Sequence, residues 1–260
     1  MILIYQKKKL NSISKTISKM ENSSNSFDGT GKEIKKLTFE ELNCLIDIIK
    51  TERITEDKIK LMITSICDLA LDGQNELSKC AQLCLQLSNA YIAKYEPKKK
   101  NQFKFHLLAH CREVFDKQKA NFFRIYYIPQ DDKHNRDETE EMTKIRLQPV
   151  TTTIFFAELY IVGIMSCKIM EYFMKVFLDP VYINKITLEC FSLLVLKIKE
   201  KYCEKNGKDL LVEMMTQVEN NCKVLKDHSS SKAKNLYQKV VDFIKDQIPQ
   251  IEQESDIFLE

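Results

Sequence analysis

Apolar residues recur at intervals of three and four along most of this chain, and no alternating strand pattern separates the repeats. In the clearest case Ile59, Met62, Ile63, Ile66, Cys67 and Ala70 would share one face of a helix. Similar spacing predicts further helices at residues 76–94, 101–117, 153–162, 166–178, 183–204, 208–225 and 230–248. The pattern therefore predicts an all-helical protein.

Start and stop signals place the first two helices. Thr38 is an N-cap candidate with Glu41 three residues later, and Leu37 precedes it as an apolar staple residue, so a helix is expected over residues 38–50. Thr55 is the cap candidate of the second helix, and the pair Asp72 and Gly73 ends it. Two helices joined by a short connection predict a hairpin.

Two interruptions are expected in the middle of the chain. The segment FFRIYYIPQDDKHNRDETEE, which contains Pro129, breaks the apolar spacing and predicts a long loop. The helical pattern resumes at about Glu138 and is expected to pause at Pro149, because proline lacks the N–H that a helix interior needs. Further helix ends are marked by Asp179–Pro180 and Asn206–Gly207.

Helix pairs that repeat about every forty residues, without a fixed polar signature, are typical of the HEAT class of α-solenoid. We therefore expect an all-α solenoid of about five antiparallel helix pairs, the last of them incomplete, over residues 37–249. Residues 1–36 hold eight lysines against three acidic residues and many Ser and Asn, which predicts a disordered basic arm. Residues 250–260 predict an acidic tail.

Charge and composition argue against several classes of function. The formal net charge is +3, and once the arm and the tail are set aside the body is close to neutral, which argues against a dedicated duplex-binding protein. Glycine and proline number five each, and no glycine-rich phosphate loop is present, so a nucleotide would be bound by a partner. No stretch reaches the length of a membrane span, and a soluble protein is expected.

The nine cysteines are scattered among apolar residues, which is typical of small buried side chains in a reducing, intracellular compartment. Cys80 and Cys84 lie one helical turn apart without a second ligand pair, so no metal site and no cofactor are expected. His106 and His110 share a helix face beside Cys111, and the favoured interpretation is a pair at the edge of the core.

Four stretches, taken in order, resemble the middle domain of eukaryotic translation initiation factor 4 gamma and its relatives. They are IKKLTFEEL (residues 34–42), CAQLCLQLS (80–88), FHLLAHCREVFDK (105–117) and FFAELYIVGIM (155–165), and LECFSLL (188–194) follows at the spacing of the family. The chain departs from the family at Ala157, where glycine is usual, and in RLQPVTTTIFF (146–156), which carries extra residues and a proline.

The resemblance implies a cytoplasmic, non-enzymatic scaffold in translation initiation that binds and stimulates a DEAD-box RNA helicase of the initiation factor 4A type and contacts RNA. Ile34, Leu37 and Leu42 match the apolar segment that contacts the helicase in the family, and Lys144 and Arg146 match basic positions near the partner surface. The alternatives are that the apolar residues only pack the first helix and that the basic ones form ordinary charge pairs.

Lys98, Lys99, Lys100 and Lys104, with Lys94 nearby, form a basic cluster that could bind RNA phosphates, because each neutralised phosphate releases a counterion. The alternative is a solvated turn. At the level of the whole protein, two other functions stay open. One is an adaptor of the same fold in nonsense-mediated decay, splicing or the regulation of poly(A)-binding protein. The other is an all-α enzyme. Other initiation factors are possible partners, and no membrane partner is expected.

Overall fold

The computed structural model describes six ranges of the chain and two isolated positions. They are residues 45–51, 54–72, 76–95, 101–126, 140–182 and 184–206, with residues 238 and 242. Within these ranges the regular structure is helical and contains no strand, so the predicted all-α class is confirmed for this part of the chain.

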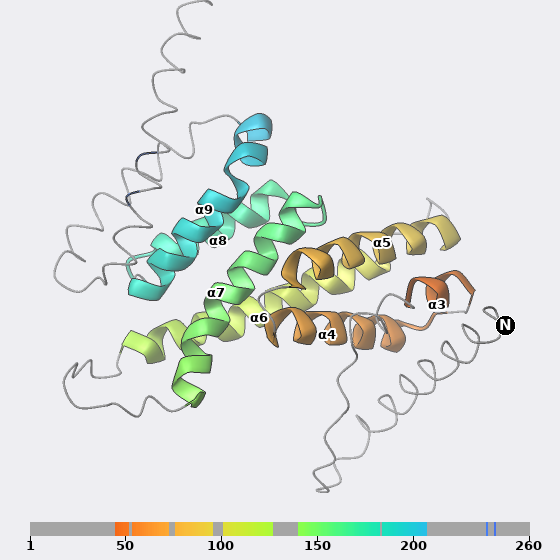
Figure 1. Cartoon of the computed structure of the whole chain (residues 1–260), viewed down its shortest axis with the longest axis horizontal. Coiled ribbons are helices and arrows are strands. Elements are labelled where there is room, and N and C mark those ends of the chain that lie inside the picture. Colours follow the sequence, from red (N-terminus) through yellow and green to blue (C-terminus); the bar gives the residue numbers. More distant parts are fainter. Residues whose placement is uncertain are drawn as a thin grey trace, which may run out of the picture. The chain divides into compact units, whose positions relative to one another are not determined.

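Seven helices make up the described ranges, and they carry the labels of Figure 1. They are α3 (Leu45–Thr51), α4 (Glu56–Asp72), α5 (Leu77–Tyr95), α6 (Gln102–Tyr126), α7 (Glu140–Ile161), α8 (Cys167–Leu178) and α9 (Lys185–Asn206).

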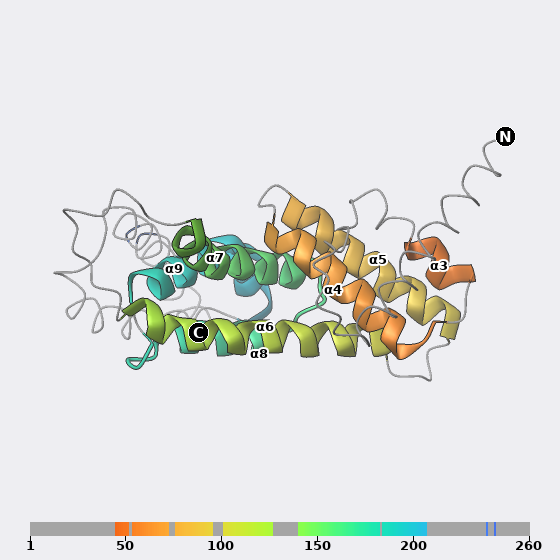
Figure 2. The ribbon, with the colours of Figure 1, turned by 90° about the horizontal axis from the view of Figure 1, so that it is seen from below.

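The chain divides into two compact units between Val114 and Phe115, so the first half of α6 belongs to one unit and its second half to the other. In the first unit α3 and α4 both pack against α5, and in the second unit α7 and α8 both pack against α9 (Figures 1 and 2). Each unit therefore contains helices that bury their apolar faces on helical neighbours.

Helix α4 follows the sequence expectation at both ends. The side-chain oxygen of Thr55 accepts a hydrogen bond from the backbone N–H of Lys58 at 3.3 Å, as an N-cap does, and the helix ends at Asp72. The buried residues of this helix are the predicted apolar set, Ile59, Met62, Ile63, Ile66, Cys67 and Ala70. Local capping and apolar spacing are sufficient to define this element.

Helix α6 is longer than predicted. The sequence indicated an end near Lys117 and a loop from Phe122, but the helix continues to Tyr126. The extension is stabilised by tertiary contacts of Phe122, which is buried with its ring 6.1 Å from that of Phe177. In addition, the side-chain amide of Asn184 donates to the backbone carbonyl of Phe122 at 3.4 Å.

The pause predicted near Pro149 is wrong, because α7 runs through this proline. A proline in a helix interior costs about 3 kcal/mol through its missing N–H and the clash of its ring. Neighbouring contacts offset this cost: the hydroxyl of Thr153 donates to the carbonyl of Pro149 at 2.8 Å, and the amide of Gln118 donates to the hydroxyl of Thr152. The second half of α6 therefore supports the helix where the local sequence would interrupt it.

The turn between α7 and α8 depends on one glycine. Gly163 has a φ of +87°, which a residue with a Cβ adopts only with strain. The N–H of Ile164 donates to the carbonyl of Leu159, and the N–H of Gly163 donates to the carbonyl of Tyr160, both at 2.9 Å. These two bonds form a Schellman motif, which satisfies carbonyls at the end of α7 and sends the chain back into α8.

Helix α9 begins with a reciprocal cap. Asn184 accepts hydrogen bonds on its side-chain oxygen from the N–H groups of Ile186 and Thr187, at 2.8 and 3.1 Å. The hydroxyl of Thr187 accepts in return from the N–H of Asn184 at 2.8 Å. This is the arrangement of a capping box, and it places the start of the helix within two residues of the sequence expectation.

Several expectations lie outside the described residues. They are the arm over residues 1–36, the tail over 250–260, the start of the first helix before Leu45, and the helices expected at 208–225 and 230–248. Among the helices that the structure does describe, none combines the length and the apolar character needed to cross a membrane.

Candidate functional site

Most of the predicted contact residues lie outside the part of the chain that the structure describes, or have side chains that it does not describe. Ile34, Leu37 and Leu42 fall outside it, and so do Lys98, Lys99 and Lys100. Lys144 and Arg146 belong to α7, but only their backbone lies within the described part of the structure. Lys104, in the first turn of α6, is the predicted site residue whose surroundings are defined. The surroundings of a predicted site residue are therefore described at the start of α6.

The start of α6 is fixed to α5 by side-chain hydrogen bonds. Asn101 caps the helix, because its side-chain oxygen accepts from the backbone N–H of Lys104 at 3.0 Å. The amide of Asn101 also donates to the hydroxyl of Ser88 at 2.7 Å, and the hydroxyl of Tyr91 donates to the amide oxygen of Gln102 at 3.0 Å. These bonds hold the first turn of α6 in one position on α5.

This first turn is electrostatically unusual. It contains no acidic residue, although acidic side chains are the ones that stabilise the positive end of a helix dipole. It carries Lys104 instead, and the sequence places Lys98, Lys99 and Lys100 immediately before it. Positive side chains at a helix N-terminus do not stabilise the helix, but together with the dipole they attract an anion such as phosphate.

An exposed aromatic residue lies beside this lysine. The side chain of Phe105 is 66% exposed, and its ring meets that of His106 edge to face at 5.3 Å between centroids. The buried residues of this stretch, Phe103 and Leu107, lie two positions away on either side. Sequence reasoning included Phe105 in a family-like segment but did not single it out, although its position between the buried residues signals exposure.

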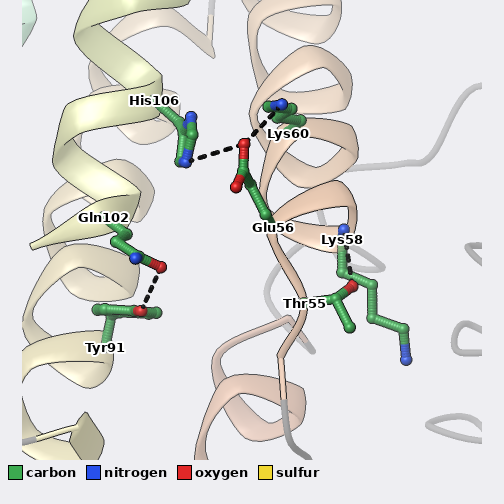
Figure 3. Close-up of polar contacts among 7 residues, drawn as sticks. All are labelled: Thr55, Glu56, Lys58, Lys60, Tyr91, Gln102 and His106. Carbon is green, nitrogen blue, oxygen red and sulfur yellow. Dashed lines mark hydrogen bonds and ion pairs between the residues drawn. The ribbon is translucent and has the colours of Figure 1, made fainter.

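The start of α4 meets α6 next to this position (Figure 3). The carboxylate of Glu56 lies 2.7 Å from the ammonium of Lys60 and 3.8 Å from the Nε2 atom of His106. The hydrogen bond from Lys60 lowers the pKa of Glu56, and the same bond raises the pKa of Lys60. We define Lys104, Phe105 and His106, with the Glu56–Lys60 pair, as the α6-start surface.

Lys94, which the sequence grouped with the basic cluster, has a structural contact. Its ammonium donates to the backbone carbonyl of Ile49 at 2.7 Å, in the last turn of α3, and lies 5.4 Å from the ring centre of Tyr95. A cation at this end of a helix satisfies a carbonyl and complements the dipole. Lys94 therefore stabilises the contact of α3 with α5 and is not assigned to the α6-start surface.

A second chemical feature of the first unit lies in its core. The side chains of Cys111 and His110, both on α6, act on the pKa of Cys67 on α4. The effect of Cys111, with a smaller contribution from His110, outweighs burial and lowers the pKa of Cys67 to about 6. The same interaction with Cys67 raises the pKa of His110, and with burial it raises the pKa of Cys111.

Sequence reasoning assigned these cysteines to the core, and Cys67 and Cys111 are indeed buried. It also placed His106 and His110 at the edge of the core, and both are half-buried. The effect of His110 on the pKa of Cys67 could not be predicted from the sequence, because the two residues lie on different helices and no spacing along the chain connects them. Among the residues described, no group of three His, Cys, Asp or Glu side chains is arranged to hold a metal ion.

Comparison with models of known protein families found no match for this chain, and comparison with curated proteins found no relative. The fold and the local geometry therefore define its class as an all-α protein of packed helices.

Proposed function

We propose that this chain is a non-enzymatic, cytoplasmic adaptor of the HEAT class that binds a DEAD-box RNA helicase of the initiation factor 4A type and contacts RNA. The proposal is supported by the order of the family-like segments. Of these, residues 80–88 lie in α5, residues 105–117 in α6, residues 155–165 in α7 and the turn after it, and residues 188–194 in α9.

The observation that carries the proposal is the pattern of helix packing. In the first unit α3 packs against α5, and in the second unit α7 packs against α9, so helices two places apart in the sequence are neighbours. When helix hairpins stack, the first helix of one hairpin contacts the first helix of the next, and this produces the same pattern. Such a stack offers extended ridges to another macromolecule.

The mechanism we propose for the helicase is a shift of conformational population. A scaffold that contacts both lobes of a helicase more favourably in one relative orientation increases the population of that orientation. Ile34, Leu37 and Leu42 would provide the apolar part of the contact, and Lys144 and Arg146 the charged part. The adaptor would speed ATP turnover without contributing a reacting group.

The RNA contact in this proposal uses the α6-start surface with the preceding lysines. Lys98, Lys99, Lys100 and Lys104 would pair with phosphates, and the exposed ring of Phe105 would stack on a base. Stacking of one base on an aromatic side chain contributes about 1–3 kcal/mol and tolerates any sequence. We therefore expect binding to single-stranded RNA with little sequence preference.

A binding experiment tests the helicase contact. The purified chain should retain an initiation factor 4A type helicase on a column, and Leu37→Asp should abolish this retention while the helical circular dichroism persists. Lys144→Glu with Arg146→Glu should weaken retention, whereas Lys168→Glu with Lys175→Glu, on the exposed side of α8, is the matched control and should not. Retention of splicing or decay factors in place of the helicase would contradict the proposal and favour the alternative adaptor role.

A separate titration with fluorescent single-stranded RNA tests the α6-start surface. Phe105→Ala should weaken binding roughly 5- to 150-fold, in proportion to the loss of about 1–3 kcal/mol of stacking. Lys104→Ala should weaken binding and lower the dependence on salt by about one counterion. Tyr172→Ala, at a half-exposed aromatic residue of α8, is the control. Equal affinity for all these variants would exclude the surface.

A further inference from the structure

Only one of the two carboxylate oxygens of Glu56 has a partner among the described residues. The Oε1 atom lies 2.7 Å from the ammonium of Lys60 and 3.8 Å from the Nε2 atom of His106, and Figure 3 shows both contacts meeting at this oxygen. The other oxygen, Oε2, takes part in neither contact, and the side chain is 56% exposed. A charged acceptor on the α6-start surface is therefore open to a ligand.

This acceptor lies close to the exposed ring of Phe105. The phenyl ring meets the imidazole of His106 edge to face, with 5.3 Å between the ring centres, and the imidazole in turn lies 3.8 Å from the carboxylate of Glu56. The side chain of His106 is only 13% exposed, so it fills the space between the other two. The carboxylate is therefore separated from the phenyl ring by one imidazole ring.

The two sides of Phe105 carry different charges. Successive residues of a helix are about 100° apart around its axis, so Lys104 and His106 flank Phe105 on opposite sides of α6. The side of Lys104 is basic, and the side of His106 leads to the carboxylate of Glu56. A nucleotide that stacks its base on Phe105 and directs its phosphate to Lys104 would therefore direct the edge of the base to Glu56.

A carboxylate distinguishes the two pyrimidine bases of RNA. It accepts hydrogen bonds and cannot donate them. Cytosine has an exocyclic amino group that donates to a carboxylate, and this is one of the recurring pairs of a side chain with a base. Uracil has a carbonyl oxygen at the same place, and its one ring N–H lies between two carbonyl oxygens that repel a carboxylate. The two bases offer the same ring size for stacking, so the edge decides between them.

We propose that Glu56 is a specificity-determining residue of the α6-start surface, and that it selects cytosine over uracil for the base stacked on Phe105. This inference rests on the RNA contact proposed above and adds a preference to it, because stacking alone tolerates any base. The preference is the effect of one hydrogen bond at an exposed position. Cytidine should therefore bind roughly 3- to 10-fold more tightly than uridine.

The first measurement uses the full, unaltered chain, so it carries no risk of a folding defect. Fluorescent oligocytidine and oligouridine of equal length are titrated with the chain at one salt concentration. Their phosphates are the same, so the ratio of the two dissociation constants reports the contact with the base. Oligocytidine should bind more tightly by the stated factor. Equal affinities, or tighter binding of oligouridine, would overturn the proposal.

A variant of nearly the same shape tests the carboxylate. Glu56→Gln places an amide at this position, and its N–H groups donate to the carbonyl oxygen of uracil, so the preference for cytidine should disappear or reverse. Both oligomers should bind somewhat more tightly, because a negative charge is removed. Glu113→Gln, at an exposed position of α6, removes the same charge and is the matched control, and it should keep the preference. A preference that survives Glu56→Gln would exclude the carboxylate as its source.

A change in the RNA tests the donor. Oligocytidine with two methyl groups on each amino nitrogen keeps the ring but loses both N–H donors, and it should bind no more tightly than oligouridine. Binding as tight as that of oligocytidine would contradict the proposed hydrogen bond.

The Phe105→Ala variant separates this inference from the RNA contact on which it rests. If Phe105→Ala leaves the affinity for RNA unchanged, the RNA contact at this surface is wrong, and the role of Glu56 falls with it. If Phe105→Ala weakens binding but the unaltered chain binds oligocytidine and oligouridine equally, the RNA contact stands and only the role of Glu56 is wrong.

Discussion

The two units of this chain are built from different core chemistry. The described core of the first unit contains four cysteines, and side-chain caps start its helices α4 and α6. The second unit buries a cluster of aromatic rings. In that cluster the rings of Phe115 and Phe173 are 4.3 Å apart between centroids, and those of Phe156 and Phe173 are 5.1 Å apart.

This difference has a functional meaning. Aromatic rings supply large apolar areas and specific packing geometry, so the second unit is suited to a stabilising role. The first unit contains four buried cysteines and the α6-start surface, where Phe105 is exposed beside Lys104. Substitutions in the aromatic cluster of the second unit should therefore mainly affect stability, and those at the α6-start surface should mainly affect binding.

The largest effect is expected at the centre of the aromatic cluster. Phe173→Ala should reduce the free energy of unfolding by about 3–5 kcal/mol, because it removes buried contacts and leaves a cavity. Its neighbour Tyr172 is 46% exposed, and Tyr172→Ala should cost much less. Urea unfolding followed by circular dichroism measures both. Equal losses for the two variants would contradict the assignment of the core to Phe173.

The next effect is expected at the start of α9. Asn184→Ala removes the cap of this helix and the bond to the carbonyl of Phe122, and it should cost about 2 kcal/mol, near the upper end of the range for a lost cap. Asn184→Asp keeps the accepting oxygen but not the donating amide, so it should retain part of the stability. If Asn184→Asp were as unstable as Asn184→Ala, the bonds that the side-chain amide donates to the carbonyls of Phe122 and Tyr182 would be more important than the cap.

A pH-dependent effect is expected from Cys190. Because burial raises the pKa of this thiol to about 12 in the folded state, its contribution to stability is complete below the pKa of the unfolded chain and is lost as pH rises above it. Between about pH 9 and 11 the loss should approach 1.4 kcal/mol for each pH unit. Cys190→Ala should flatten this alkaline decline. An unchanged decline would show that the thiol is ionised in the folded protein.

The smallest effect on stability is expected at the α6-start surface. Glu56 and Lys60 are both more than half exposed, and solvent screens their attraction. Because its folded pKa is lowered, Glu56 contributes only above its unfolded pKa, and this contribution is lost as pH falls through the folded value. Glu56→Gln should therefore leave the urea midpoint at neutral pH almost unchanged. A large shift would mean that this surface is part of the folding core.

Local signals were sufficient for much of the fold. The cap at Thr55, the apolar spacing in α4 and the start of α5 could all be read from neighbouring residues. The passage of α7 through Pro149 and the extension of α6 to Tyr126 could not, because both depend on contacts with residues far away in the chain, such as Gln118 and Asn184.

The same distinction applies to the site residues. Lys98, Lys99 and Lys100 form a run in the sequence, and Lys104, four residues later, lies in the first turn of α6 as predicted. Lys94 was grouped with them by proximity in the sequence, but its side chain reaches α3. The influence of Cys111 and His110 on the pKa of Cys67 acts between residues more than forty positions apart, and no local pattern indicates it.

The proposal that this chain activates a helicase without catalysing a reaction itself is tested most directly by the rate of ATP hydrolysis. An initiation factor 4A type helicase, assayed with RNA, should hydrolyse ATP faster when the purified chain is added, while the chain alone shows no ATP hydrolysis. Leu37→Asp should remove the acceleration. An unchanged helicase rate with saturating amounts of the folded chain would contradict the account.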